Sequence, residues 1–217
     1  IKDLCKSYDG FAIDRLSLTV PQGCIVGLIG ENGAGKSTTI NLILDTIHKD
    51  SGSITLLGKD NTQNTSALKE DIGIVPDEPG FPECLTAGQM NSIMKYTFTR
   101  WDETAFNNYI SMLKIPAGQP FKDFSKGMKM KLSIAVAISH NAKLLILDEP
   151  TGGLDPVVRD EVKDMFNEFT RDETHSVLIS SHIVSDLEKI CDYIAFIHKG
   201  RLLLFEEKDA LLDRHCI

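Results

Sequence analysis

Short apolar runs rich in β-branched residues recur along the chain and predict the strands of an α/β domain. They lie at residues 16–20, 25–29, 54–57, 72–75, 144–147, 177–179, 193–197 and 202–205. After residue 37 the apolar residues recur instead at helical spacing, at Ile40, Ile43, Leu44 and Ile47. This second pattern predicts a helix that follows a glycine-rich segment and stops before Ser51 and Gly52.

The strand pattern vanishes in the middle of the chain. Helical spacing replaces it over residues 89–98 and 103–113. We therefore predict a helical subdomain at about residues 79–139. It is inserted into an α/β core formed by residues 1–78 and 140–217, so that the whole chain makes a single domain.

The last two apolar runs flank the loop His198-Lys199-Gly200. Glycine accepts the left-handed backbone that a tight turn requires, so this loop predicts a β-hairpin near the end of the chain. The sequence shows no internal repeat and no low-complexity segment. One mixed α/β domain with a partly antiparallel sheet is therefore expected.

Composition and charge restrict the class of protein. Hydrophobic residues make up 42% of the 217 residues and charged residues 25%, which is ordinary soluble usage, and no apolar run is long enough for a membrane span. A net charge of −8 disfavours a broad basic face, so we expect no nucleic-acid partner. Five scattered cysteines without a C-x-x-C pair indicate a reducing cytosol rather than a zinc or redox site.

A phosphate-binding loop is predicted between the strand at 25–29 and the following helix. Residues 30–37 match G-x-x-x-x-G-K-[ST] in the strand-to-helix context that this pattern requires, which disfavours an ordinary glycine-rich turn. Glycines let backbone N–H groups converge on phosphate oxygens, and the helix N-terminus adds its positive dipole end. Lys36 would reach the β and γ phosphates, and the Ser37 hydroxyl would bind Mg²⁺. The predicted binding residues are Gly30, Glu31, Asn32, Gly33, Ala34, Gly35, Lys36, Ser37 and Thr38.

The apolar run at 144–147 ends in two carboxylates, Asp148 and Glu149. A buried apolar strand does not normally finish in this way without a charged partner. Asp148 is placed to hold Mg²⁺, directly or through water, and Glu149 to act as general base on the attacking water. A solvated acidic strand end would be the simpler interpretation if the phosphate loop were absent.

A serine and a glycine at the start of an apolar helical run narrow the class further. They belong to Phe124-Ser125-Lys126-Gly127-Met128, in which Ser125 suits a helix N-cap. The N–H groups and the hydroxyl at such a helix start can bind a γ-phosphate, although an ordinary capped helix explains the segment taken alone. Together with the two other motifs, the segment resembles the L-S-G-G-Q signature of the ATP-binding-cassette (ABC) family. It resembles the variant found in many of the smaller bacterial members, and only Ser125 and Gly127 match the consensus strictly.

Three further positions resemble motifs of this family. Gly153-Leu154-Asp155 resembles its D-loop, His182 its switch histidine, and Tyr8 its adenine-stacking aromatic. His182 lies beyond the carboxyl end of a predicted strand, where α/β sheets bind ligands, and would donate to the γ-phosphate and orient Glu149. A lone histidine or tyrosine is otherwise more often structural, and Phe11 lies near Tyr8 in the sequence.

One position departs from the family pattern. The segment from Ile72 to Asp77 resembles the Q-loop strand, but Asp77 stands where the family usually has glutamine. A carboxylate can still ligate Mg²⁺, so Asp77 joins Ser37 and Asp148 as an expected metal ligand. Its charge near the triphosphate predicts a metal dependence or a hydrolysis rate that differs from the family norm.

The resemblance covers essentially the whole chain and implies a P-loop NTPase core, which is a mixed sheet with flanking helices. An antiparallel β part and an inserted helical subdomain carrying the signature motif complete the implied fold. The resemblance also implies ATP and Mg²⁺ as cofactors, with Glu149, His182 and Lys36 as catalytic residues and Asp155 near the nucleotide.

Several partners follow from the resemblance. A second ATP-binding domain would pair head to tail with this one, because the signature of one domain covers ATP held by the other. Transmembrane transporter subunits would place the chain on the cytoplasmic face of the cell membrane. ATP hydrolysis would then power transport, and the short length and signature variant resemble small bacterial exporters.

Two alternatives stay open on the sequence. The first is a soluble ABC-type ATPase, but such proteins usually carry two cassettes, long coiled coils or zinc modules. The second is a regulatory cassette with weak hydrolysis. Glu149 and His182 argue against it, whereas Asp77 keeps it open.

Overall fold

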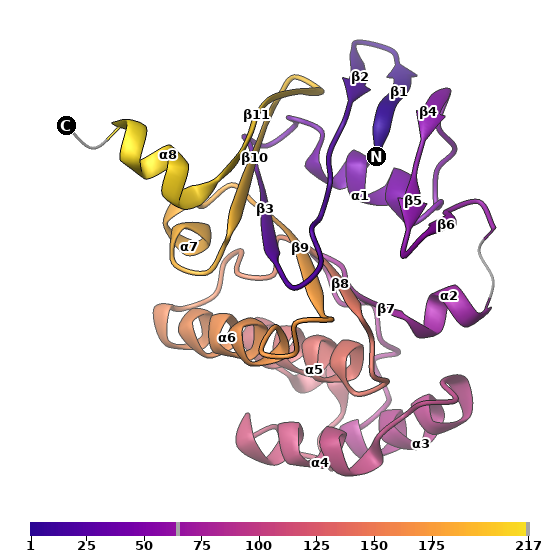
Figure 1. Ribbon diagram of the computed structural model, residues 1–217. Helices are drawn as coiled ribbons and strands as arrows, with labels where there is room; N and C mark the ends of the chain where they lie inside the picture. Colours follow the sequence, from indigo (N-terminus) through magenta and orange to yellow (C-terminus); the bar gives the residue numbers. More distant parts are fainter. Residues whose placement is uncertain (64–65, 216–217) are drawn as a thin grey trace.

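A six-stranded sheet forms the centre of the computed structural model, which describes residues 1–63 and 66–215 (Figure 1). Its strand order is β11-β10-β3-β9-β8-β7. The strands are β3 (Ile25–Ile29), β7 (Ile72–Val75), β8 (Leu144–Asp148), β9 (Ser176–Ser181), β10 (Tyr193–His198) and β11 (Arg201–Glu207). All neighbours are parallel except β10 and β11, which form the predicted antiparallel hairpin.

A smaller antiparallel part lies beside this sheet and covers its α1 side (Figure 1). Three strands form a sheet in the order β2-β1-β4, and two more form a short hairpin. They are β1 (Lys2–Tyr8), β2 (Phe11–Leu16), β4 (Ser51–Ser53), β5 (Thr55–Leu56) and β6 (Lys59–Asp60). The mixed α/β architecture with an added antiparallel part confirms the predicted fold class.

Helices occupy both faces of the central sheet and form a separate group at one end (Figure 1). They are α1 (Lys36–Ile43), α2 (Ser66–Glu70), α3 (Ala87–Thr97), α4 (Glu103–Met112), α5 (Lys126–Ile138), α6 (Pro156–Phe169), α7 (Val184–Glu188) and α8 (Lys208–His215). A 3₁₀ turn at Phe121–Asp123 leads into α5. Within the described part of the chain, no helix combines the length and the apolar character that crossing a bilayer requires.

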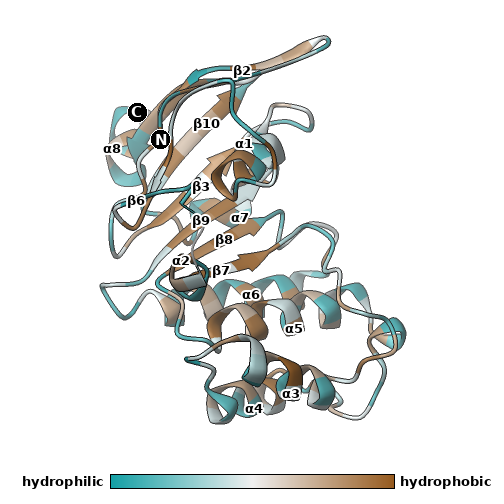
Figure 2. Ribbon diagram, turned by 90° about the vertical axis from the view of Figure 1, so that its right-hand side faces the viewer, coloured by the Kyte–Doolittle hydropathy of each residue, from teal (hydrophilic) through white to brown (hydrophobic). Residues whose placement is uncertain are grey.

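Alternating strand residues divide the hydrophobic core into two layers, because successive side chains of a strand point to opposite faces. On β8, Leu145 and Leu147 belong to the layer shared with α5 and α6, whereas Leu144 and Ile146 belong to the layer shared with α1 and the antiparallel part. All five residues of β8 are buried. A strand buried on both faces reads as a continuous apolar run, which explains why this strand was predictable. Figure 2 shows the same apolar character along β8, β9 and β10.

The helical group contains α3 and α4, joined to the sheet through α5. Helices α3 and α4 begin with side-chain caps from Thr86 and Asp102. Their observed starts lie within two residues of the predicted ones. Buried residues of α5 belong to the core layer that covers β8 as well as to the packing against α4. The boundary expected near residue 139 stays a prediction, since α5 contacts both parts.

Two boundaries in the first quarter of the chain were predicted wrongly. The apolar run at 16–20 does not form a strand of its own, because β2 ends at Leu16 and Leu18 is buried in an irregular segment. Helix α1 ends at Ile43, because Asp45 takes a left-handed backbone conformation with φ 54°. The apolar residues beyond each end still pack on the core. The hydrophobic pattern therefore indicated burial here rather than regular secondary structure.

Strand β1 gave no apolar pattern, because Leu4 is its only fully buried residue. It pairs with β2 on one side and β4 on the other, and its polar residues face solvent. Tertiary pairing therefore creates this strand against a weak local signal.

Gly73 marks a close approach between β7 and α5, which yields a first test of the fold. A Cβ at Gly73 would meet the carbonyl oxygen of Ala137 and lie 2.5 Å from Leu145 Cδ2. We expect Gly73→Ala to lower the free energy of unfolding by about 1–3 kcal/mol, because the Ala137 carbonyl belongs to the backbone and cannot yield without a shift of β7 or α5. Gly80→Ala is the matched control, since a Cβ there meets nothing within 4 Å. Guanidinium unfolding followed by circular dichroism measures both, and equal midpoints would contradict the assigned contact.

Candidate functional site

The loop between β3 and α1 is built on left-handed glycines. Gly33 has φ 80° and Gly35 has φ 111°, a region that residues with a Cβ rarely adopt. A Cβ at Gly35 would also lie 2.7 Å from Ile13 Cδ1. The loop leads directly into α1 at Lys36, so its backbone N–H groups and the helix N-terminus together form an anion-binding concavity.

The Lys36 side chain crosses this loop and is only 5% exposed. Its Nζ donates to the carbonyl oxygens of Gly30 at 2.7 Å and Glu31 at 3.2 Å. It also lies 3.1 Å from Oε1 of Glu149. A buried cation held mainly by two carbonyl dipoles and one carboxylate is well placed to accept a phosphate anion in exchange.

The two carboxylates at the end of β8 face different partners. Asp148 Oδ1 accepts a hydrogen bond of 2.5 Å from the Ser180 hydroxyl. Glu149 has φ 49°, and its backbone N–H donates to the carbonyl and the hydroxyl oxygens of Ser180. This reversal of the chain ends the strand and turns the Glu149 carboxylate toward the phosphate loop. A left-handed non-glycine residue is uncommon and here coincides with a proposed catalytic group.

His182 completes a chain of three ionisable groups. Its Nδ1 lies 2.7 Å from Glu149 Oε2, and its backbone N–H donates to the same oxygen at 3.3 Å. The imidazole is 43% exposed, so its far edge faces the open side of the site. Glu149 is thereby placed between Lys36 and His182, with one carboxylate oxygen toward each. The structure brings together these three residues, which come from three separate motifs of the sequence.

Ser180 is a residue of the candidate site that the sequence analysis missed. It is fully buried on β9 and contacts both Asp148 and Glu149. The sequence carried a weak signal for it, since Ser180 and Ser181 are polar residues at the end of a buried strand that leads to His182. A hydroxyl that fixes one oxygen of Asp148 leaves the other oxygen free to ligate a metal or a water.

The remaining predicted metal ligands differ in position. Ser37 lies exposed in the first turn of α1, as a hydroxyl that meets a phosphate-bound Mg²⁺ must be. The described residues contain no group of three or more His, Cys, Asp or Glu side chains able to hold a metal. Ser37 and Asp148 fit a Mg²⁺ ion that keeps several waters and is held mainly by nucleotide phosphates.

Asp77 follows β7 and is exposed. Partial burial raises the pKa of its carboxyl above the ordinary value, against a lowering effect of Lys126. The carboxylates of Asp148 and Glu149 also raise this pKa, which places Asp77 within electrostatic reach of the site.

Tyr8 lies at the end of β1 directly opposite Phe11 of β2, at the mouth of the site. Tyr8 is 46% exposed, and the Lys6 ammonium lies 5.6 Å from its ring centre. Phe11 is half-buried and packs on the phosphate loop, since a Cβ at Gly35 would lie 2.9 Å from its ring. Tyr8, whose ring is exposed, stays the predicted platform for a base.

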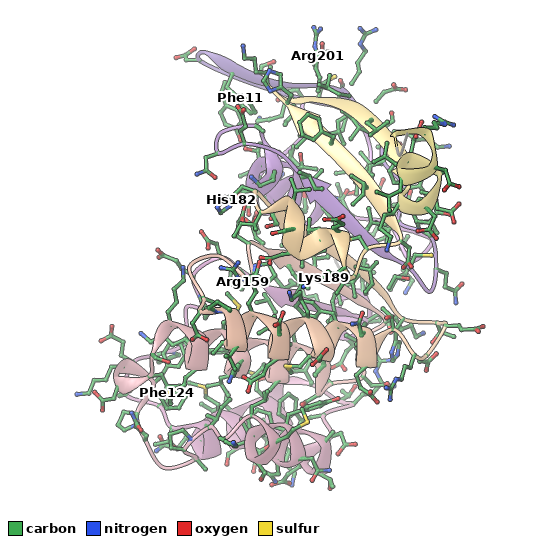
Figure 3. All side chains as sticks on the ribbon, turned by 90° about the vertical axis from the view of Figure 1, so that its left-hand side faces the viewer. Phe11, Phe124, Arg159, His182, Lys189 and Arg201 are labelled. Atoms are coloured by element: carbon green, nitrogen blue, oxygen red, sulfur yellow. The ribbon has the colours of Figure 1, made fainter. Side chains whose placement is uncertain are left out.

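The signature segment caps a helix away from the phosphate loop. Ser125 Oγ accepts from the Met128 N–H at 3.2 Å, which confirms its expected N-cap geometry. Gly127 lies against α6, where an added Cβ would approach Val158 to 3.1 Å. In Figure 3, Phe124, the first residue of the signature segment, lies well apart from His182. The chain does not bring its own signature to its own phosphate loop.

The segment from Gly152 to Asp155 connects Glu149 to α6. The Gly152 N–H donates to the Glu149 carbonyl at 3.0 Å, and the Asp155 carboxylate caps α6 by accepting from the Val158 N–H. Lys126 of the signature reaches the same segment, beside Gly153. The loop after Glu149 therefore contacts the signature helix within one chain.

Comparisons with known proteins agree with this geometry. The family model described as "ABC transporter" matches residues 13–152. The bacitracin transport ATP-binding protein BcrA of Bacillus licheniformis is 36% identical over 93% of this chain and 67% of its own length. The lantibiotic transport ATP-binding protein SrtF of Streptococcus pyogenes is 35% identical over 96% of this chain and 90% of its own length.

Solved structures show the same architecture. An ATP-binding subunit of an ABC transporter superposes with a TM-score of 0.86 at 28% identity, covering 98% of this chain and 91% of that one. A dimeric ATP-binding cassette bound to ADP and Pi in a post-hydrolysis state shares the fold at 18% identity and a TM-score of 0.83, covering 95% of this chain and 97% of that one. Together with the phosphate loop and the Lys36–Glu149–His182 arrangement, these similarities show that the chain belongs to the ABC transporter family and is an ATPase of that family.

Proposed function

We propose that this chain binds MgATP at residues 30–38 and hydrolyses it as the motor of a membrane exporter, working as one half of a head-to-tail dimer. The observation that carries the proposal is the position of Glu149 between Lys36 and His182 at the phosphate loop. Such a cluster supplies an anion site, a general base and a group that orients the base.

Nucleotide binding exchanges the partners of Lys36. The triphosphate provides anionic oxygens that attract Nζ more strongly than two carbonyls do, so Lys36 turns to the β and γ phosphates. Glu149 then loses its contact with Lys36 and becomes free to accept a proton from the attacking water. His182 keeps Glu149 oriented by donating from Nδ1–H to Oε2. A simultaneous hydrogen bond from Nε2 to the γ-phosphate would require a proton on both ring nitrogens.

Mg²⁺, when bound, would offset the charge of the β and γ phosphates. Ser37 and Asp148 would hold it, with Ser180 fixing the orientation of Asp148. Asp77 is a further candidate ligand through water, because the carboxylates of the site act on its pKa. Tyr8 would stack on adenine at the mouth of the site.

Two subunits are needed to close each nucleotide site. Ser125 and Gly127 lie at the start of α5, directly after Phe124, which Figure 3 shows well apart from Phe11 and His182. A second cassette would bring this helix N-terminus to the γ-phosphate, with Asp155 at the seam. Closure would then depend on the phosphate that hydrolysis removes, so that binding closes the dimer and product release reopens it.

The proposal that the chain powers an exporter rests on two of its relatives and on the transmembrane partners expected for such a cassette. BcrA and SrtF are named as ATP-binding proteins of bacitracin and lantibiotic transport. A cassette of this kind would act from the cytoplasmic face of the membrane through transmembrane subunits. Asp77 and the helical group would pass the closing motion to those subunits, as switch segments respond to a γ-phosphate elsewhere.

The role of Glu149 is tested by Glu149→Gln. We expect MgATP turnover to fall at least about 100-fold, because the amide cannot accept the proton of water, and ATP to accumulate in a trapped dimer. Turnover and the mass in solution with and without ATP are the measurements. Glu168→Gln is the matched control, since Glu168 pairs with Arg171 in the exposed last turn of α6.

Each outcome of this comparison has a meaning. Full turnover in Glu149→Gln would remove Glu149 as the base. ATP binding without turnover in the unaltered chain would favour the regulatory cassette. An unaltered mass with ATP for both chains would contradict the two-subunit site.

Ser180→Ala tests the orientation of Asp148. Loss of the 2.5 Å hydrogen bond leaves the carboxylate free to rotate, so we expect the Mg²⁺ concentration for half-maximal turnover to rise about 10-fold. Ser176→Ala is the control at the opposite end of β9, where the hydroxyl accepts from the Gly23 N–H. Equal Mg²⁺ requirements in the two variants would show that Ser180 has only a packing role.

A further inference from the structure

Asp186 is a buried carboxylate behind the nucleotide site that the proposed chemistry leaves unused. It belongs to α7 and is 3% exposed. Two cations of α6 face it, with Arg159 Nε 3.5 Å from Oδ2 and Lys163 Nζ 3.9 Å from Oδ1. Figure 3 shows Arg159 between the ribbons of α6 and α7.

These contacts are an unfavourable way to hold α6 and α7 together. Arg159 Nε and Asp186 Oδ2 are both buried, and neither makes a hydrogen bond within the described chain. A buried ion pair without good hydrogen bonds seldom stabilises a protein more than apolar residues of similar volume would. The pair therefore fits a positioning role better than a stabilising one.

Arg159 has a second contact that points to the nucleotide site. Its guanidinium Nη2 donates to the Leu154 carbonyl at 3.0 Å, in the loop that begins at Glu149. The same loop is closed by the hydrogen bond from the Gly152 N–H to the Glu149 carbonyl. One planar fork thus contacts the loop beyond Glu149 and the helix beyond His182, and a lysine amine cannot reproduce that geometry.

The turn of the chain beyond His182 ends at Asp186. Its N–H donates to the Ile183 carbonyl at 3.2 Å, and the Ile183 N–H donates to the Ser181 hydroxyl at 3.0 Å. The segment from Ser181 to Asp186 is therefore a tight turn held at both ends, with His182 inside it. Movement of Asp186 relative to α6 would carry the imidazole away from Glu149 Oε2, at present 2.7 Å from Nδ1.

We propose that Arg159 and Asp186 form a positioning pair that fixes the distance between the Glu149 loop and the His182 turn. The inference rests on the proposed roles of Glu149 and His182. The Leu154 segment adjoins the proposed dimer seam. The pair can therefore transmit closure of the dimer to the Glu149–His182 contact. Neither residue touches the reacting atoms, and both act through His182.

The test is a double-mutant cycle on MgATP turnover in the full chain. We expect Asp186→Asn to lower kcat about 10-fold and to change KM for ATP less than about 2-fold, because the ground-state phosphate contacts remain. In a His182→Ala background, Asp186→Asn should lower kcat no further, because residues that act through one group are not additive.

Lys163→Met is the matched control. The Lys163 side chain is more deeply buried than that of Arg159 and faces the same carboxylate. Its other partner is Asp160 on α6 rather than the Glu149 loop. We expect the midpoint temperature of thermal unfolding to fall at least as far in Lys163→Met as in Asp186→Asn, while kcat of Lys163→Met stays within about 2-fold of the unaltered chain. A kcat that follows thermal stability across both variants would overturn the positioning role.

Arg159→Lys keeps the test decisive where Asp186→Asn does not fold. It retains the charge beside Asp186 and loses the fork to the Leu154 carbonyl, so kcat should fall while KM holds. Additive losses with His182→Ala would overturn the inference and leave the proposed chemistry intact. An unchanged kcat in His182→Ala alone would instead overturn the proposed role of His182, and the inference with it.

Discussion

The nucleotide site depends on the register of three parallel strands. Strand β9 lies between β3 and β8, with Ile29 opposite Ser181 and Asp148 opposite Ser180. Because the three strands are parallel and in register, their carboxyl ends reach one edge of the sheet together. The phosphate loop, the two carboxylates and the histidine turn each follow one of these ends, which brings Lys36, Glu149 and His182 within ion-pair distance.

Burial keeps this edge of the sheet stiff. The strands carry apolar residues on both faces, with α5 and α6 on one side and α1 with the antiparallel part on the other. Close packing leaves little freedom for the strand ends, so the polar groups that extend from them are preorganised. The same packing leaves several polar groups buried. Ser180 and Asp148 satisfy each other through a hydrogen bond, whereas Arg159 and Asp186 interact only as an ion pair.

The signature and the phosphate loop sit at different ends of this framework, which has a mechanical consequence. The signature starts α5, and the loop beyond Glu149 lies beside it, with Lys126 next to Gly153. A partner cassette that pressed on this surface would contact a loop only a few residues from the proposed base. In the proposed two-subunit site, the sheet would thus supply a rigid half, and the other half would move on assembly.

The sequence by itself determined the local features: the phosphate loop and its glycines, the capped starts of α3, α4 and α5, the hairpin at Gly200 and the apolar strands. Each depends on residues close in the chain, whose backbone preferences and periodicity act without distant partners. Only the tertiary structure decided the strand order, and with it the Lys36–Glu149 contact, the role of Ser180 and the burial of Asp186. Strand β1 also required it, because pairing with β2 and β4 outweighed its weak local signal.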